Sequence, residues 1–207
     1  YNKKFNIPYE QNIIERNIAL IAFSLGLGDS KLEIKNKTSF LYSRQNYIIE
    51  SLSKTKKNII LIPGASHKSK CYPLENLAKL TTLIDANFII IWGDTNEKEM
   101  AKKIKTHGSN VIICEKLSID SLISLVSQVD LVIGPDTGPA HIAWALNVPS
   151  IMLFGPTPGY RNTYATKVNR VIESKSIVNP FKINKNDFSI KEIDVQEILK
   201  VAKNLLN

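Results

Sequence analysis

From Asn58 onward, the sequence alternates short apolar runs with stretches of helical periodicity, and this alternation constrains the fold more than any other feature. The apolar runs are rich in Ile, Val and Leu and end at turn residues, which is typical of buried strands. We predict strands at 58–62, 88–92, 111–113, 131–133 and 150–154, separated by helices at 73–85, 97–105, 119–127 and 139–146. Because strands that alternate with helices form right-handed crossovers, the chain is expected to be an α/β protein with a doubly wound, Rossmann-like parallel sheet.

The segments on either side of this alternation have weaker patterns. Residues 10–27 have apolar positions at roughly helical spacing and end in a glycine-containing turn, which predicts an amphipathic helix. A short strand at 32–34 and a helix at 44–53 are expected next. A strand at 168–173 and an amphipathic helix at 195–206 are predicted after the alternation. We therefore divide the chain into three parts, which are a lead-in segment at 1–57, a Rossmann-like domain at 58–190 and a C-terminal helical segment at 191–207.

Composition and charge exclude several classes of protein. No apolar run approaches the roughly 20 residues that cross a bilayer, and residues 1–10 are too polar for a signal peptide, so a cytoplasmic protein is expected. The two cysteines, Cys71 and Cys114, have neither metal-binding nor redox spacing. The net charge is +8, but the lysines are scattered without interleaved aromatic residues, which favours a solvated surface over a nucleic-acid groove. Because the chain begins at Tyr1 without a preceding strand, we expect it to be a fragment.

Ligands of open α/β sheets bind beyond the carboxyl ends of the strands, so the loops at these ends are the candidate site. The strongest candidate follows the strand at 131–133 and consists of Asp136, Thr137, Gly138, Pro139 and His141. Asp136 or Thr137 can cap the next helix, Pro139 suits its first turn, and the amides of Thr137 and Gly138 can bind a diphosphate. Asp136 would repel a diphosphate, so we assign it to sugar hydroxyls, and His141 can donate to a phosphate oxygen. On its own the motif would indicate only a capped helix with a surface histidine.

Two further strand ends carry polar residues, and their agreement with the first favours a ligand site. The loop after 58–62 contains Ser66, a hydroxyl donor, and Lys70, which can offset the charge of a leaving diphosphate. It lacks the spacing of a Walker loop, and a solvated loop is the alternative. After 88–92, Asp94 or Glu97 can accept hydrogen bonds from a ribose diol. Capping of the following helix by Asp94, with Glu97 in its first turn, explains the pair equally well.

These loops, in this order, resemble glycosyltransferase family 9, the heptosyltransferases. The motifs that carry the resemblance are P-G-A-S with Lys70 and Pro73, W-G-D-x-x-E, K-L-S-I-D-S-L at 116–122, G-P-D-T-G-P-A-H-I-A-W-A, and L-F-G-P-T-P. The opening segment also resembles the interdomain segment of that family. The similarity is greatest to the heptosyltransferase I branch and spans nearly the whole chain, although it covers only the second half of such an enzyme. After Thr157, residues 158–164 depart from the family pattern.

The resemblance implies the C-terminal domain of a GT-B glycosyltransferase. Such an enzyme transfers L-glycero-D-manno-heptose from ADP-heptose to Kdo of the lipopolysaccharide or lipooligosaccharide inner core with inversion. Ala65 stands where a hydroxyl residue is often found in the family. The implied donor contacts are Ser66 and Lys70 near the phosphates and heptose, Glu97 or Asp94 toward the ribose, Leu117 on the adenine, Asp136 at the heptose, and Thr137, Gly138, Pro139 and His141 along the diphosphate.

The resemblance also implies that the catalytic base is a carboxylate of a separate N-terminal domain. We therefore expect no catalytic residue in this chain, which would bind the donor without transferring the sugar, and the helix at 191–207 would pack toward that domain with its apolar face partly exposed. No D-x-D pair occurs at the phosphate loops, so no metal or other cofactor is expected. The expected partners are ADP-heptose and, through the full-length enzyme, Kdo-lipid A, with no nucleic acid, at a cytoplasmic location that includes the inner-membrane surface. A sugar-nucleotide 2-epimerase that uses a uridine nucleotide and a non-catalytic nucleotide-binding module are the alternatives.

Overall fold

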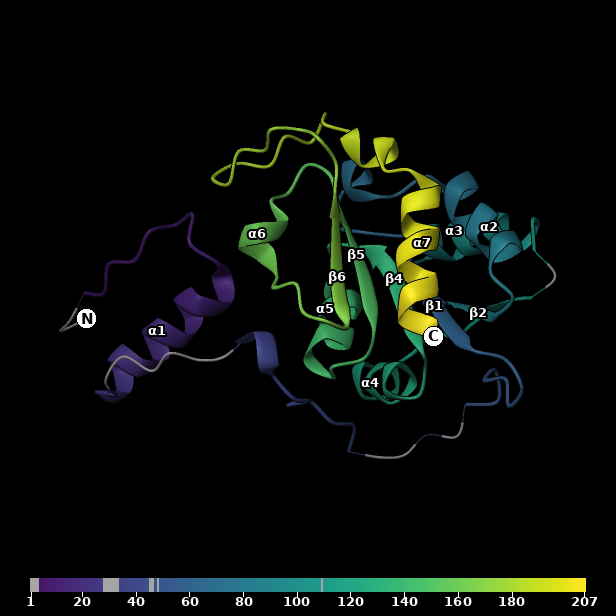
Figure 1. Ribbon diagram of the computed structural model, residues 1–207, viewed down its shortest axis with the longest axis horizontal. Helices are drawn as coiled ribbons and strands as arrows, with labels where there is room; N and C mark the ends of the chain where they lie inside the picture. Colours follow the sequence, from purple (N-terminus) through teal and green to yellow (C-terminus); the bar gives the residue numbers. More distant parts are fainter. Residues whose placement is uncertain (1–3, 28–33, 45–46, 48, 109) are drawn as a thin grey trace.

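A parallel sheet of six strands forms the centre of the protein (Figure 1). The computed structural model describes residues 4–27, 34–44, 47, 49–108 and 110–207. The strands are β1 (Asn58–Leu61), β2 (Asn87–Ile90), β3 (Val111–Ile113), β4 (Leu131–Pro135), β5 (Ser150–Phe154) and β6 (Asn169–Glu173). Their order across the sheet is β3-β2-β1-β4-β5-β6, and every neighbouring pair is parallel. This order is that of a Rossmann fold, which confirms the expected fold class.

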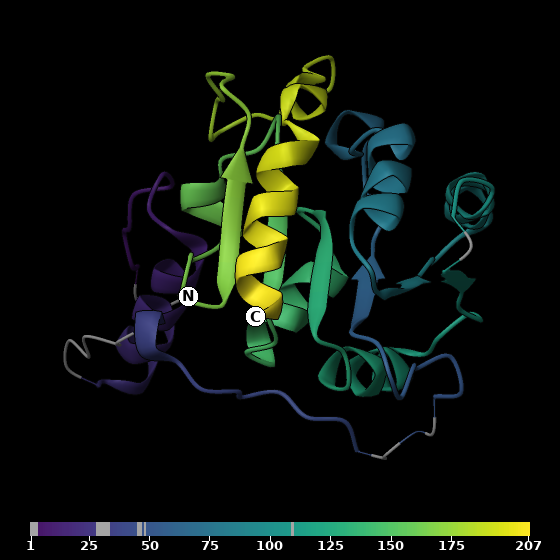
Figure 2. The ribbon, with the colours of Figure 1, turned by 45° about the vertical axis from the view of Figure 1, so that its right-hand side comes forward.

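Helices cover both faces of the sheet, so the strands are buried on both sides. On one face α2 (Leu74–Leu83), α3 (Thr95–Lys105) and α7 (Val195–Leu206) pack against the side chains of one alternating set of strand residues. On the other face α4 (Ile119–Ser127) and α5 (Gly138–Ala145) pack against the second set. Figure 2 shows α7 in front of the sheet and running along its strands, and its contacts with the sheet are with β4 and β5. Burial on both faces explains why the strands appear in the sequence as continuous apolar runs.

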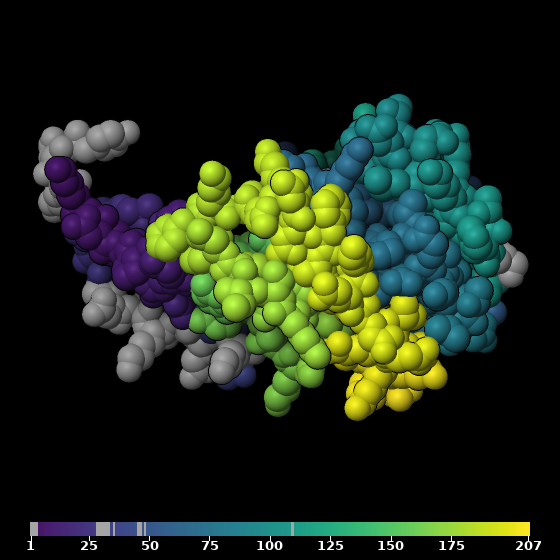
Figure 3. All heavy atoms as spheres, turned by 90° about the horizontal axis from the view of Figure 1, so that it is seen from above, coloured from purple at the N-terminus to yellow at the C-terminus, as the bar shows by residue number. Residues whose placement is uncertain are grey.

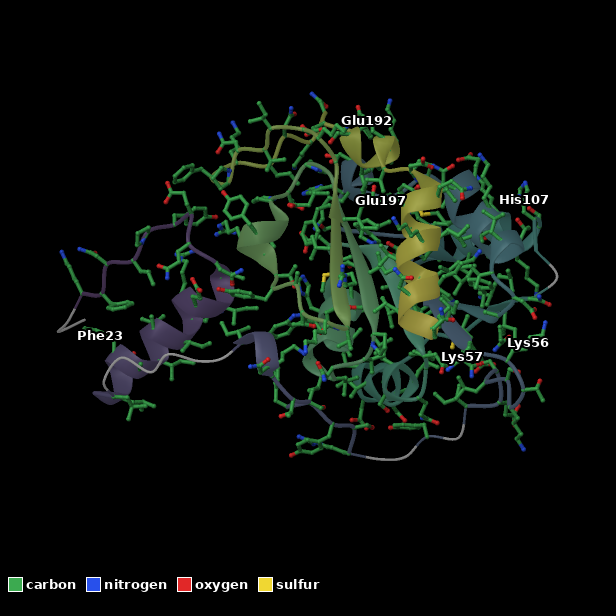
Figure 4. All side chains as sticks on the ribbon, viewed as in Figure 1. Phe23, Lys56, Lys57, His107, Glu192 and Glu197 are labelled. Carbon is green, nitrogen blue, oxygen red and sulfur yellow. The ribbon has the colours of Figure 1, made fainter. Side chains whose placement is uncertain are left out.

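The N-terminal helix α1 (Ile13–Leu25) lies at one end of the molecule, as Figures 1 and 3 show. The side chain of Asn12 caps it by accepting from the amide of Ile14, and Gly26 ends it in the left-handed region, at φ 67°. None of its side chains is fully buried, and Phe23 lies on the part of the helix far from the sheet (Figure 4). The helix contacts α6 (Gly159–Asn162), the short helix after β5, and Ile14 packs against the core on the α4 face.

Short 3-10 helices complete the described structure, at η1 (Ile34–Asn36), η2 (Lys68–Lys70) and η3 (Ser189–Glu192). The strand expected at 32–34 falls on two residues outside the described ones and on Ile34, which begins η1. The helix expected at 44–53 is wrong for the residues of that range that are described, because they form bends and turns. Ile49 and Leu52 nevertheless pack against the core on the α4 face.

The apolar face of the C-terminal helix is buried over most of its length, and the expected partial exposure is found only at its end, where Leu205 is half-buried. Val195, Ile198, Leu199 and Ala202 are buried and belong to the core formed with α2, β4 and β5. The helix needs no second domain to cover these residues, because the sheet already covers them. A contact between this segment and another domain stays a prediction.

Candidate functional site

The direction of the strand order reverses between β1 and β4, and the crevice at this point holds a buried ion pair. Lys70, in η2 after β1, places its Nζ 3.0 Å from Oδ2 of Asp136, which follows β4. The two side chains are only 11% and 9% exposed. In doubly wound sheets this crevice is where ligands bind. The fold therefore brings two oppositely charged site candidates into direct contact at the expected position.

Asp136 is the centre of a hydrogen-bond network built from three loops. Its Oδ1 lies 2.9 Å from Nε2 of His141, and its Oδ2 accepts from the hydroxyl of Thr157 and from the amide of Asn162, both at 3.1 Å. Burial alone would raise the pKa of Asp136. The hydrogen bond with His141 and the charge of Lys70 lower it by more than burial raises it, so the pKa lies well below its usual range. Asp136 is therefore a carboxylate at neutral pH.

The N-terminus of α5 is open toward the same crevice. Thr137 occupies the capping position but makes no side-chain capping bond, and both oxygens of Asp136 face side-chain donors. The expectation that the side chain of Asp136 or Thr137 caps this helix is therefore wrong. A Cβ atom at Gly138 would meet nothing within 4 Å, so open space lies beside the first residue of the helix. An anion is favoured at this end of α5, because free amides and the positive end of the helix dipole lie there beside Lys70 and His141.

A cavity of about 420 Å³ lies along the flank of α5, beside Asp136. Asp136, His141 and Asn162 form its polar side. Apolar residues form the remaining walls, and they come from α1, from α5 and from the segment before β1: Ile13, Ile14, Phe40, Trp144 and Ala145. The cavity thus offers a carboxylate and an amide next to the helix end, which suits a hydroxyl-rich group attached to an anion.

The remaining candidates lie on neighbouring loops at the same edge of the sheet. Ser66 is exposed between β1 and η2, and Leu117, after β3, is half-buried against the α4-side core. Glu97 accepts from the amide of Gly93 at 2.6 Å, and its carboxylate covers Gly64, where a Cβ atom would lie 2.2 Å from Oε1. Asp94 caps α3 by accepting from the amide of Glu97, so its capping role is observed. The assigned ligand contacts of these residues stay predictions.

Sequence reasoning missed Thr157 and Asn162 as parts of the site. Thr157 follows the carboxyl end of β5, so the rule that selected the other loops could have selected it too. Asn162 is the last residue of α6, and no pattern in the sequence shows that α6 brings its amide to Asp136. Among the described residues, no cluster of three or more His, Cys, Asp or Glu side chains could hold a metal ion.

Comparison with known sequences gives a family match over most of the chain. The model of glycosyltransferase family 9 (heptosyltransferase) matches residues 1–186. Lipopolysaccharide heptosyltransferase 1 of Campylobacter coli is 37% identical over 99% of this chain and 64% of its own length. Lipopolysaccharide heptosyltransferase 1 of Escherichia coli K12 is 28% identical over 79% of this chain and 51% of its own length. The chain thus spans less than two thirds of these relatives.

Solved structures with the same fold include two heptosyltransferases. Escherichia coli heptosyltransferase WaaC with ADP matches at a TM-score of 0.74 and 19% identity, over 99% of this chain and 60% of that one. Escherichia coli ADP-heptose lps heptosyltransferase II matches at 0.69 and 22% identity, over 97% of this chain and 64% of that one. These matches agree with the expected Rossmann-like domain of a GT-B enzyme.

Proposed function

Because the chain belongs to glycosyltransferase family 9, we propose that it supplies the donor site of a heptosyltransferase and binds ADP-L-glycero-D-manno-heptose. The open N-terminus of α5, beside the buried cluster of Lys70, Asp136 and His141, carries this proposal. A solved neighbour of the same fold, Escherichia coli WaaC, has been determined with ADP and with ADP-2-deoxy-2-fluoro heptose.

The proposed donor lies across the carboxyl edge of the sheet. Its diphosphate accepts hydrogen bonds from the amides of Thr137 and Gly138 and from His141, and Lys70 offsets its charge. Its heptose enters the cavity at Asp136, whose anionic oxygens accept from sugar hydroxyls. On the far side, Glu97 or Asp94 binds the ribose and Leu117 packs on the adenine, while Ser66 and Pro139 border the phosphates.

In the proposed reaction, a hydroxyl of Kdo attacks the anomeric carbon of the heptose with inversion while ADP leaves. The helix amides and Lys70 stabilise the charge that develops on the diphosphate, so the proposed transfer needs no metal. The base that takes the proton of the acceptor is a carboxylate in the part of the relatives that this chain does not span. The chain alone therefore binds the donor without turnover. Release of ADP from ADP-heptose and Kdo-lipid A by this chain alone, or donor binding that requires magnesium, would contradict these two statements.

Calorimetric titration with ADP, UDP and ADP-heptose tests the donor assignment. We expect the adenine nucleotides to bind in preference to UDP. Lys70→Ala should weaken both adenine ligands, because it removes a cation from the diphosphate, and Asp136→Ala should weaken ADP-heptose more than ADP. Preference for UDP would instead support a 2-epimerase-like protein, and failure to bind any nucleotide would remove the proposal.

We further propose a cytoplasmic protein that associates peripherally with the inner membrane and does not bind nucleic acid. None of the helices in the described part of the chain has the length and apolarity needed to cross a bilayer. The net charge of +8 suits a phosphorylated lipid acceptor at an anionic surface. Cell fractionation tests the location, and a steep salt dependence of binding to a DNA or RNA duplex would contradict the exclusion of nucleic acid.

A further inference from the structure

Asp136 is held by side-chain donors on both of its oxygens. Its Oδ2 receives Lys70, Thr157 and Asn162, and its Oδ1 receives His141. Each oxygen of an ionised carboxylate offers about two lone-pair positions, so three donors saturate Oδ2, whereas Oδ1 has one partner. Oδ2 can therefore accept a sugar hydroxyl only after at least one of its protein donors turns away.

Two of the four donors have a competing partner when an anion occupies the N-terminus of α5. Lys70 is a cation, and His141 lies one turn inside this helix. A diphosphate at the open helix end would attract both side chains, because Lys70 carries a positive charge and His141 can donate a hydrogen bond to a charged phosphate oxygen. Thr157 and Asn162 lie outside α5, in the segment after β5, and carry no charge. They are the two donors that can remain on Asp136.

Asn162 is held in one orientation by contacts that reach the N-terminal segment. Its side-chain oxygen accepts from a terminal nitrogen of Arg161 at 3.1 Å, which directs its amide nitrogen to Asp136. The Nε of Arg161 donates to the carbonyl of Tyr9 at 2.9 Å, and its guanidinium lies 4.1 Å from the centre of the Tyr9 ring. Asn12 also holds this segment in place. Its side-chain amide donates to the backbone carbonyls of Tyr160 and Thr163, which lie on either side of Asn162, at 2.8 Å each.

We propose that Asn162, together with Thr157, is a positioning residue that keeps Oδ2 of Asp136 in place while Lys70 and His141 turn toward the diphosphate. The positions that these two residues vacate then accept the hydroxyls of the sugar. Asn162 lines the same cavity as Asp136 and His141, so the carboxylate that it holds faces the space for the sugar. This inference rests on the proposed function, because it requires a sugar linked to a diphosphate at α5.

The test is a calorimetric comparison of ADP with ADP-heptose. In Asn162→Ala, we expect the Kd for ADP to stay within about twofold and the Kd for ADP-heptose to rise about tenfold, the loss typical of one hydrogen bond to a charged group. Thr157→Val keeps the side-chain shape and removes the other neutral donor. It should also raise the ratio of the Kd for ADP-heptose to the Kd for ADP. Asn204→Ala, on the exposed face of α7, is the matched control and should change neither Kd.

The two variants separate a positioning role from a structural one. If Asn162→Ala does not fold, Thr157→Val decides the question, because its shape is conserved. The inference is overturned if the variants that fold leave the ratio of the two Kd values unchanged, or weaken both ligands equally. Should that happen while the wild-type chain still binds ADP-heptose more tightly than ADP, the proposed function stands. A wild-type chain that binds neither ligand, or that prefers UDP, overturns both.

Discussion

Replacing Lys70 with methionine should destabilise the protein strongly, because the replacement removes one member of a buried ion pair. The two charged atoms of Lys70 and Asp136 are 3.0 Å apart, and the side chains are 11% and 9% exposed. Loss of one partner from such a pair costs about 3–5 kcal/mol. Asp136 keeps three other donors, so we expect the lower end of this range, about 3 kcal/mol. In a chain of this length the loss corresponds to a fall in Tm of roughly 6–12 °C.

Urea unfolding followed by circular dichroism measures this free energy, and a surface pair provides the control. The charged atoms of Lys57 and Asp130 are 3.1 Å apart, but their side chains are 54% and 33% exposed. Because solvent screens such a pair, Lys57→Met should change the unfolding free energy by less than about 1 kcal/mol. Combining Lys70→Met with Asp136→Asn should cost less than the sum of the single changes, by about 1–3 kcal/mol.

Two results would refute the reasoning. A loss in Lys70→Met no larger than that in Lys57→Met would mean that the Lys70 pair is as hydrated as a surface pair. Effects of Lys70→Met and Asp136→Asn that add to within about 0.5 kcal/mol would mean that the two side chains do not interact in the folded protein.

Three further predictions follow from distances and charges at the site. The lowered pKa of Asp136 gives stability that is present above its ordinary pKa, near 3.9, and is lost as the pH falls through the lowered value. Urea midpoints of the wild type should therefore fall more steeply below about pH 4 than those of Asp136→Asn, and parallel profiles would contradict this. Gly134→Ala should lower the unfolding free energy by about 1–3 kcal/mol, because the added Cβ would lie 2.6 Å from Cβ of Ile62, and an unchanged Tm would show that the strands yield without cost. In Gly138→Ala the added methyl group would meet no protein atom within 4 Å, so Tm should stay unchanged. ADP should bind more weakly, because the methyl group enters the space proposed for the diphosphate. An unchanged ADP affinity would mean that the diphosphate binds elsewhere.

The sheet could be predicted from the sequence because each strand carries its own signal. All residues of β1, β4 and β5 are buried, so each of these strands appears in the sequence as an apolar run rather than an alternating one. The helices α2, α3 and α4 have their apolar positions mainly on one side, and Asp94 and Ser118 mark the starts of α3 and α4 by capping. These signals depend only on residues close together in the sequence, so they can be recognised without knowing the tertiary structure.

Features that depend on what covers a surface could not be predicted in the same way. Ile49 and Leu52 have the three-residue spacing of a helix, but they pack against the core from turns, because tertiary contacts outweigh so short a periodicity. The amphipathic pattern of α7 shows that one of its faces is apolar without showing which partner covers that face. The partner is this domain's own sheet, through residues far away in the sequence.

The contact between Lys70 and Asp136 depends on strand order, which an alternation of strands and helices does not determine. In a sheet with the strands in sequence order, β1 and β4 would be three spacings apart, about 14 Å at roughly 4.8 Å per strand. At that separation the two loops could not form an ion pair, and the carboxylate of Asp136 would need other partners. In the observed order β4 lies beside β1 and β5 beside β4, so the loops after these three strands all reach Asp136. The charge state of Asp136, and with it any role in binding a sugar next to a diphosphate, is therefore a consequence of topology as well as of the residue itself.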